Sequence, residues 1–306
     1  MKLTLLSLTL MVLTAWPTES LESTTHQEEK TNTANLSGKA LNYYNYAIKG
    51  DAEAQYQLGN CYLHGHGVDI DYKKAVDWLT KAAEQGNSRA QCDLAVCYAN
   101  GEGVDVDEKQ TVYWYQKAAD QNDPLALRGL YLCYAMGTGV EVNEDKALDY
   151  LTRAAEAGLV LAQHELGVEY YNDGDPSAAY EWFIKAAEQG FARSQNELGL
   201  LYLDGEGVAC DRGQAAMWFE KAAMQGHAGA MNNLAAIYVQ EGNYEFAVPW
   251  LERSANLGYI EALYNLAMCY KEGKGVEKNL DKAKELLKIA ADKGDYISTI
   301  ELRNMK

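Results

Sequence analysis

Proline is scarce in this chain, with 4 copies among 306 residues, and phenylalanine is equally rare. Few prolines favour long uninterrupted helices, because proline removes a backbone donor and breaks a helix interior. Basic residues are also in deficit, since 27 Lys and Arg stand against 44 Asp and Glu, a formal net charge of −17. Nucleic acids and anionic membranes bind clustered Lys and Arg, and no large basic patch is visible. We therefore expect no nucleic-acid partner.

Motifs for metal binding and for covalent catalysis are missing as well. No H-E-x-x-H or C-x-x-C pattern occurs; His164-Glu165 begins like the former, but Val168 stands where the second histidine is needed. The serine motifs G-x-S-x-G and S-x-x-K and the K-T-G motif are absent too. We therefore expect no metal, no cofactor and no catalytic residue.

The first residues are typical of a targeting segment. Lys2 precedes an apolar run, Leu3 to Leu13, which is short for a membrane span. We interpret residues 1–20 as a signal peptide, with an uncleaved anchor as the alternative, and residues 21–38 as a flexible polar leader. The sequence thus predicts an exported protein, periplasmic or secreted, that is not an integral membrane protein after signal cleavage.

The rest of the chain repeats itself. Glycines preceded by an Ala-Ala pair recur at 36- or 32-residue spacing, Gly50 and Gly258 fit the same frame, and Asn122 replaces glycine once. Residues 39–306 thus form one repeat domain. Its seven full units and C-terminal cap are 51–86, 87–122, 123–158, 159–190, 191–226, 227–258, 259–294 and 295–306.

Each unit predicts two helices. Unit position eight is always leucine, position twelve is always tyrosine, and small and apolar residues recur at helical spacing in both halves of the unit. The closing glycine predicts a helix C-cap, and an Asp or Asn before the second helix predicts an N-cap. The N-cap residues are Asp71, Asp107, Asn143, Asp175, Asp211, Asn243 and Asn279. One such unit cannot bury its apolar face alone, whereas stacked units can.

The motif A-x-x-x-L-G-x-x-Y-x-x-G-x-G-V, followed by K-A-x-x-W-x-x-K-A-A-x-x-G, resembles the Sel-one-like repeat family, a relative of the tetratricopeptide repeats. The resemblance runs from Gly50 to Gly294. It implies an all-α fold, a right-handed α-solenoid of about seven two-helix repeats. Units four and six lack the G-x-G-V turn and should instead have a tight inter-helix turn.

Inside the G-x-G turns, only the glycines and the following valine repeat. The residue between the glycines varies freely: His66, Glu102, Thr138, Glu206 and Lys274. His64 and His66 therefore occupy free turn positions rather than a metal site.

A binding groove is the remaining functional candidate, because solenoids present extended concave surfaces. In the related tetratricopeptide family, the residue two before the structural leucine faces the groove. That column, position six, is the least repetitive of the first helix, and position ten should face the same way. Solvent exposure alone also explains a variable column. The predicted partner-binding residues are Tyr56, Asn60, Arg128, His164, Asn196, Asn232 and Tyr264.

These features predict an exported scaffold or adaptor that binds a protein or peptide along the concave face and is not an enzyme. By resemblance, exported proteins of this type serve in envelope assembly, in cell-wall or polysaccharide machinery and in host contact. The competing hypothesis is a weak cell-wall-directed enzyme of the β-lactamase or penicillin-binding type, as resemblance to cysteine-rich relatives implies. No serine motif of those enzymes can be matched to a residue here.

The six cysteines predict free thiols rather than disulfides. Cys61, Cys97, Cys133 and Cys269 all stand at position eleven, and equivalent positions of adjacent units lie about 10 Å apart, a helix-packing distance too long for a disulfide. Some exported relatives pair cysteines between the two helices of one unit, but the second-helix cysteine is missing here. We expect thiol titration of unfolded, unreduced protein to detect free cysteines. A count of none would contradict this prediction.

Overall fold

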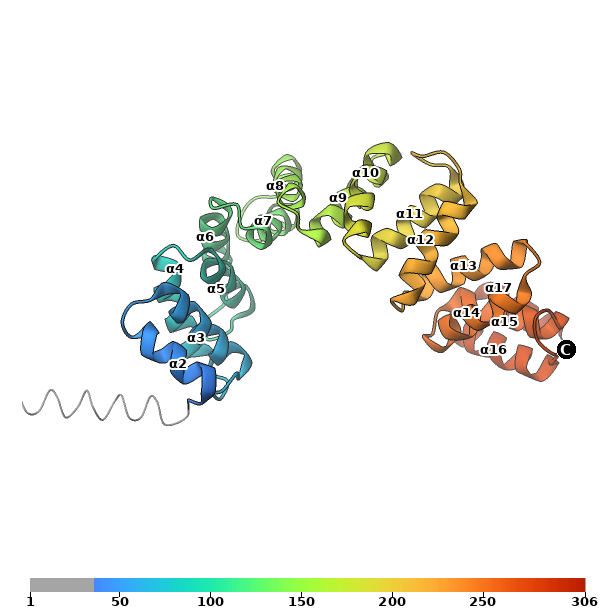
Figure 1. Cartoon of the computed structure of the whole chain (residues 1–306), viewed down its shortest axis with the longest axis horizontal. Coiled ribbons are helices and arrows are strands. Elements are labelled where there is room, and N and C mark those ends of the chain that lie inside the picture. Colours follow the sequence, from blue (N-terminus) through green and yellow to red (C-terminus); the bar gives the residue numbers. More distant parts are fainter. Residues whose placement is uncertain (1–35, 306) are drawn as a thin grey trace, which may run out of the picture. The chain divides into compact units, whose positions relative to one another are not determined.

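The computed structural model describes residues 36–305, which form sixteen helices and no strand (Figure 1). The predicted signal peptide and nearly all of the leader lie outside these residues. None of the described helices is long and apolar enough to cross a membrane. The helices are α2 (Gly38–Ala47), α3 (Ala52–His64), α4 (Tyr72–Glu84), α5 (Ser88–Asn100), α6 (Glu108–Ala119), α7 (Pro124–Met136), α8 (Glu144–Glu156), α9 (Val160–Asn172), α10 (Pro176–Glu188), α11 (Ala192–Asp204), α12 (Arg212–Met224), α13 (Ala228–Gln240), α14 (Tyr244–Asn256), α15 (Ile260–Glu272), α16 (Leu280–Asp292) and α17 (Tyr296–Asn304).

The described part of the chain divides into two compact bodies, with the boundary between Trp114 and Tyr115. Successive helices pack together, from α2 to α5 in the first body and from α7 to α17 in the second. A first helix contacts the second helix of its own unit and that of the unit before it, as α3 does in one body and α9, α11, α13 and α15 do in the other. This is the all-α solenoid that the repeat predicts.

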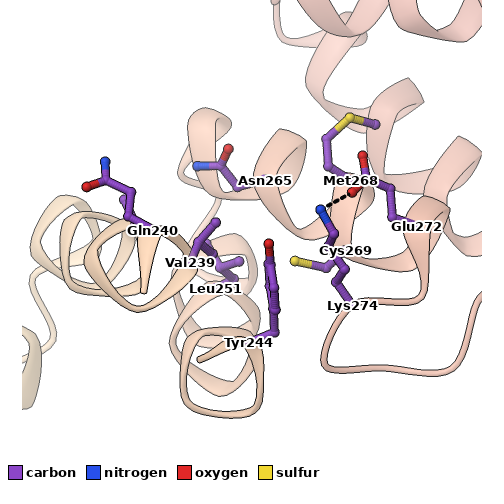
Figure 2. Close-up of a pocket in the computed structure, with 10 residues that line it drawn as sticks. Val239, Gln240, Tyr244, Leu251, Asn265, Met268, Cys269, Glu272 and Lys274 are labelled. Carbon is purple, nitrogen blue, oxygen red and sulfur yellow. Dashed lines mark ion pairs between the residues drawn. The ribbon is translucent and has the colours of Figure 1, made fainter. Parts of the chain in front are cut away.

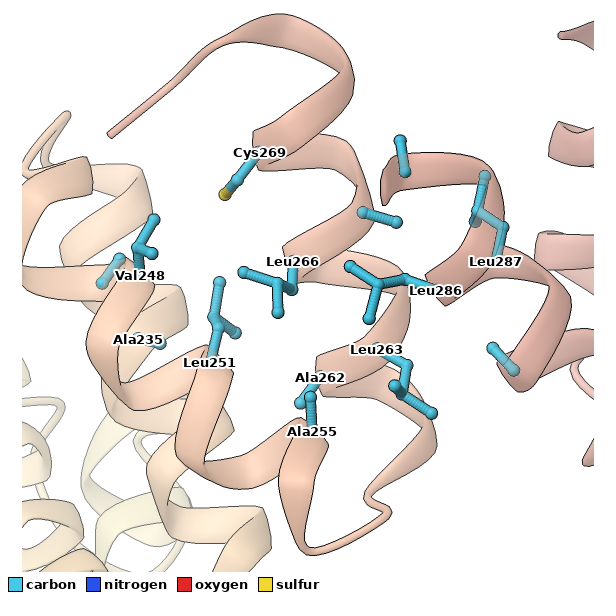
Figure 3. Packing of buried hydrophobic residues seen from close by; sticks show 14 residues of the cluster. Ala235, Val248, Leu251, Ala255, Ala262, Leu263, Leu266, Cys269, Leu286 and Leu287 are labelled. Carbon is cyan, nitrogen blue, oxygen red and sulfur yellow. The ribbon is translucent and has the colours of Figure 1, made fainter. Parts of the chain in front are cut away.

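The repeated leucine column forms the centre of the core. All seven position-eight leucines are buried, from Leu58 at 0% exposure to Leu266 at 4%. Figure 3 shows Leu266 of α15 between Leu251 of α14 and Leu286 of α16. One first helix thus fills the space between two second helices, so the core continues from unit to unit.

Small residues allow this close packing. A Cβ added to Gly199 of α11 would lie 2.4 Å from the Phe219 ring of α12, and one added to Gly167 of α9 would lie 2.6 Å from Phe183 of α10. Since real Cβ atoms do not approach other atoms so closely, the facing aromatic rings fit only against glycine.

The predicted caps are confirmed at most units. Asp71, for example, accepts from the backbone N–H of Lys74 at 3.1 Å, and Asn122 has the left-handed φ of 58° expected at a helix end. The N-cap prediction is wrong at Asn243, whose side chain makes no cap bond and donates to Glu241 at 3.1 Å instead. The tight turns of units four and six are confirmed, since α9 and α10 are separated by 173–175 and α13 and α14 by 241–243.

Buried glutamines connect neighbouring units. The side-chain amide of Gln195 on α11 donates to the backbone carbonyl of Ala187 on α10 at 3.0 Å, and its oxygen accepts from Gln225 on α12 at 2.8 Å. Gln55 and Gln163 make the same two bonds in their units. Each such glutamine satisfies a carbonyl at the end of the preceding helix, where intrahelical partners run out. Sequence reasoning missed this role, although glutamine recurs at position five.

The second glycine of the G-x-G turn touches the preceding unit. Gly207 has φ of +70°, and a Cβ on it would lie 2.2 Å from the backbone carbonyl oxygen of Pro176 at the start of α10. The closing glycine Gly190 has φ of +91°, but a Cβ added there would have nothing within 4 Å. A side chain at Gly190 would therefore meet backbone strain alone, whereas a side chain at Gly207 would meet both backbone strain and a steric clash.

We predict that Gly190→Ala lowers the free energy of unfolding by about 1 kcal/mol through left-handed strain alone. Gly207→Ala should cost at least about twice as much, because its methyl group also displaces the start of α10. Urea denaturation followed by far-UV circular dichroism measures both losses. Equal losses would show that the contact with Pro176 does not hold the units together.

Candidate functional site

The predicted binding residues lie on the first helices, and we call the surface formed by unit positions six, seven, ten, thirteen and fourteen the first-helix face. Tyr56 and Asn60 belong to α3 of the first body, and the other five predicted residues belong to the second body. Several of these side chains are engaged by the next unit. Position six of one unit bonds to position seven of the following one at Arg128, Asn196 and Asn232.

Arg128 shows this pairing most strongly. Its guanidinium binds both carboxylate oxygens of Glu165 on α9, with Nε–Oε2 of 2.7 Å and Nη2–Oε1 of 2.6 Å. Both side chains are only about a quarter exposed, at 26% and 22%. A bidentate pair of this kind fixes geometry as well as charge. The Glu165 bonds raise the pKa of Arg128.

Two asparagines continue the pairing along α11, α13 and α15. Asn196 accepts from Asn233 at 3.1 Å, and Asn232 accepts from Asn265 at 2.9 Å. Asn196 and Asn232 are buried, with 7% and 8% exposure. A partner protein can therefore reach little of these two side chains.

The remaining predicted residues differ in their surroundings. Asn60 donates a hydrogen bond to Asp93 of α5 at 3.3 Å. The Arg89 guanidinium lies over the Tyr56 ring, 5.8 Å from the ring centroid. Burial, followed by the negative charge of Asp93, raises the pKa of Tyr56. Tyr264 packs against the buried cluster of α14, α15 and α16.

His164 lies in an apolar setting beside one hydroxyl. Its Nδ1 is 3.0 Å from the buried Ser194 hydroxyl, and its ring packs against Phe183 and Phe191. Burial, and then the positive charge of Arg193, lower the pKa of His164.

Two pockets on the first-helix face involve the same unit positions. The N-terminal pocket, of about 390 Å³, lies in the first body and includes Tyr56, Asn60, His64, Tyr72, Asp93 and Glu102. The C-terminal pocket, of about 220 Å³, lies in the second body and includes Gln240, Tyr244, Asn265, Met268, Glu272 and Lys274 (Figure 2). Both open between one first helix, the next first helix and the tyrosine that begins the intervening second helix.

The two pockets differ in charge. In the C-terminal pocket the Lys274 ammonium lies 2.6 Å from the Glu272 carboxylate and 5.2 Å from the centroid of the Tyr244 ring (Figure 2). The hydrogen bond to Glu272 raises the pKa of Lys274, and the same bond lowers the pKa of Glu272. The N-terminal pocket has the carboxylates of Asp93 and Glu102, and no lysine or arginine lines it.

Sequence reasoning found two residues of the N-terminal pocket, Tyr56 and Asn60, but not the tyrosines that begin α4 and α14. The available signal was their position directly after the N-cap. In other units that place is taken by Glu108, Glu144, Pro176, Arg212 and Leu280.

The cysteines follow the repeat. Those at position eleven are buried as expected, and Cys210 is exposed. Within residues 36–305, no group of three or more His, Cys, Asp and Glu side chains is arranged to hold a metal ion.

Comparisons with known proteins identify the repeat. The Sel1 repeat matches residues 52–87, 88–123, 125–159, 160–191, 192–227, 228–259 and 260–295. A solved structure of c5321, "a protective antigen present in uropathogenic Escherichia coli strains displaying an SLR fold", is similar with 32% identity and a TM-score of 0.79. The match covers 85% of this chain and 58% of c5321. A Sel1 repeat protein from Oxalobacter formigenes matches with 29% identity and a TM-score of 0.67, covering 86% and 79% of the two chains. No curated protein matches.

Two half-buried histidines should make the stability of the protein depend on pH. His227 is the N-cap of α13, where its Nδ1 accepts from the Ala230 N–H at 3.1 Å, and burial followed by Arg193 lowers its pKa, as in His164. Both folded-state pKa values lie below the ordinary histidine value of 6.5, so the unfolded chain binds more protons in the interval below 6.5. The stabilisation is complete above about pH 6.5 and is lost as pH falls through the folded pKa values.

We expect the free energy of unfolding to decrease as pH is lowered from 7 to about 5. The double variant His164→Gln, His227→Asn should flatten this part of the profile, because asparagine caps a helix without titrating. His66→Gln, at an exposed turn position, is the control. Urea denaturation at each pH measures the effect, and an unchanged slope in the double variant would contradict it.

Proposed function

Because the chain belongs to the Sel1 repeat family, we propose that it is an exported scaffold that holds a protein segment along its first-helix face. The observation that supports this most directly is the recurrence of a pocket at the same unit positions in both bodies. Repeated pockets along stacked helices suit an extended partner, since one segment can place several side chains at once.

The surface chemistry supports a protein partner. The first-helix face combines tyrosine, arginine, histidine and asparagine with aliphatic residues such as Val96 and Val168, which are each 36% exposed. Aromatic and arginine side chains are enriched where protein interfaces are strongest. The negative charge of the whole chain favours a partner with basic segments.

Export and an envelope role are part of the proposal. The apolar run after Lys2 supports a signal peptide. The similarity to c5321, described as a protective antigen, supports a location outside the cytoplasm. Cell-wall or polysaccharide machinery and host surfaces are the settings that we propose for the partner.

Site-specific photocrosslinking in intact cells tests the face that is used. We expect a photoreactive residue at Val96 or Val168, on different first helices, to crosslink the same protein in the periplasmic or secreted fraction. Leu148 of α8 and Met217 of α12 are matched controls on second helices, with 38% and 36% exposure. Crosslinks to that protein from the controls only, or from none of the four positions, would contradict the proposal.

A further inference from the structure

We propose that the N-terminal pocket binds a cationic side chain, lysine or arginine, of the partner segment. This inference rests on the proposed function and adds the chemistry that the first of the two pockets recognises. The lining residues carry two carboxylates, Asp93 and Glu102, and two phenol rings, Tyr56 and Tyr72. Carboxylates and aromatic faces both attract ammonium and guanidinium groups.

The chain itself shows a cation in the equivalent pocket. Lys274 comes from the G-x-G turn of unit seven and extends over Tyr244, the residue that begins the second helix of unit six. Glu272 holds the ammonium at 2.6 Å. The C-terminal pocket is thus already occupied by an internal lysine, which fits its smaller volume of about 220 Å³.

Glu102 occupies the turn position that corresponds to Lys274. Tyr72 corresponds to Tyr244 in the same way, since each is the first residue of its second helix. The backbone arrangement is therefore repeated, whereas the internal cation is replaced by a carboxylate. The pocket is larger, about 390 Å³, and no side chain of the described residues takes the place that Lys274 has in the C-terminal pocket. Glu102 also accepts from the Asn100 side chain of its own turn at 3.3 Å.

The turn position is well placed to contact a ligand on the preceding unit. In unit five the same position is Glu206, whose carboxylate accepts from the Tyr171 hydroxyl of unit four at 2.7 Å. The turn side chain therefore reaches the preceding unit in two places, at Tyr171 of a first helix and at Tyr244 of a second helix. Arg89 already lies over the Tyr56 ring and also contacts Glu53 at 3.7 Å, so Tyr72 is the ring left for a cation from outside. Tyr72 is 43% exposed, so its ring is accessible to a side chain from outside.

Two peptides test the chemistry on the full chain: acetyl-Ala-Ala-Lys-Ala-Ala-amide and the same peptide with norleucine in place of lysine. We expect the lysine peptide to shift the backbone NMR signals of Tyr72, Asp93 and Glu102. One side chain should give millimolar affinity, so titration extends to about 10 mM. The norleucine peptide should bind about three- to tenfold more weakly, which is the range of one exposed ion pair and one cation–π contact.

Three variants change the residue between the two turn glycines. This position holds His66, Thr138 and Lys274 in other units, so the turn accepts different side chains there. Glu102→Gln should weaken binding of the lysine peptide about threefold. Glu102→Lys should abolish it, because the new ammonium fills the pocket as Lys274 fills its own. Lys274→Glu should create a second site with shifts at Tyr244 and Asn265. An unchanged amide spectrum outside the pocket shows that each variant is folded.

The proposal is overturned if both peptides shift the same signals with equal affinity, if no signal of the N-terminal pocket moves, or if Glu102→Lys binds as well as the natural chain. If the pocket proposal fails in this way but Val96 and Val168 still crosslink the partner, the proposed scaffold function is still supported. Loss of photocrosslinking together with specific lysine binding would instead contradict the scaffold and keep the pocket.

Discussion

The sharing of each first helix between two second helices is the constraint from which the rest of the structure follows. A single two-helix unit exposes the apolar side of its leucine column, and only the preceding unit covers it. Leu266, with α14 on one side and α16 on the other, shows how completely this burial depends on neighbours. The close approach that it demands explains why glycine faces Phe219 and Phe183, and why the second turn glycine lies against the preceding helix.

Close stacking also brings helix ends and polar side chains into the interior. Carbonyl groups at the ends of second helices become buried at the boundary between units, where an unpaired group is costly. Gln195 and its equivalents supply the donor. On the first-helix face, Arg128 and Glu165 form a partly buried ion pair, and Asn196 and Asn232 bond to the next first helix. Part of this surface therefore connects the units rather than remaining open to partners.

The sequence was sufficient to predict what depends on one unit at a time. The helices, the glycine and Asn122 helix ends, the buried leucines and most N-caps follow from local spacing, and they are present. Contacts between units could not be predicted in the same way, because they depend on which position of one helix meets which position of the next. The link between Arg128 and Glu165 joins positions six and seven of successive units, a register that repetition alone does not reveal. The pockets depend on the same register together with a turn from a third segment.

In the G-x-G turn, the fold requires the two glycines but not any particular residue between them. Its glycines are fixed, the first by a left-handed helix end and the second by the approach of a neighbouring backbone. The residue between them meets neither requirement and points toward the preceding unit, where Lys274 and Glu206 each contact a tyrosine. This position holds His66, Glu102, Thr138, Glu206 or Lys274 in different units, so its charge varies while the turn is kept. In the proposed scaffold, recognition can therefore differ between repeats whose backbones are the same, through the positions that vary from unit to unit.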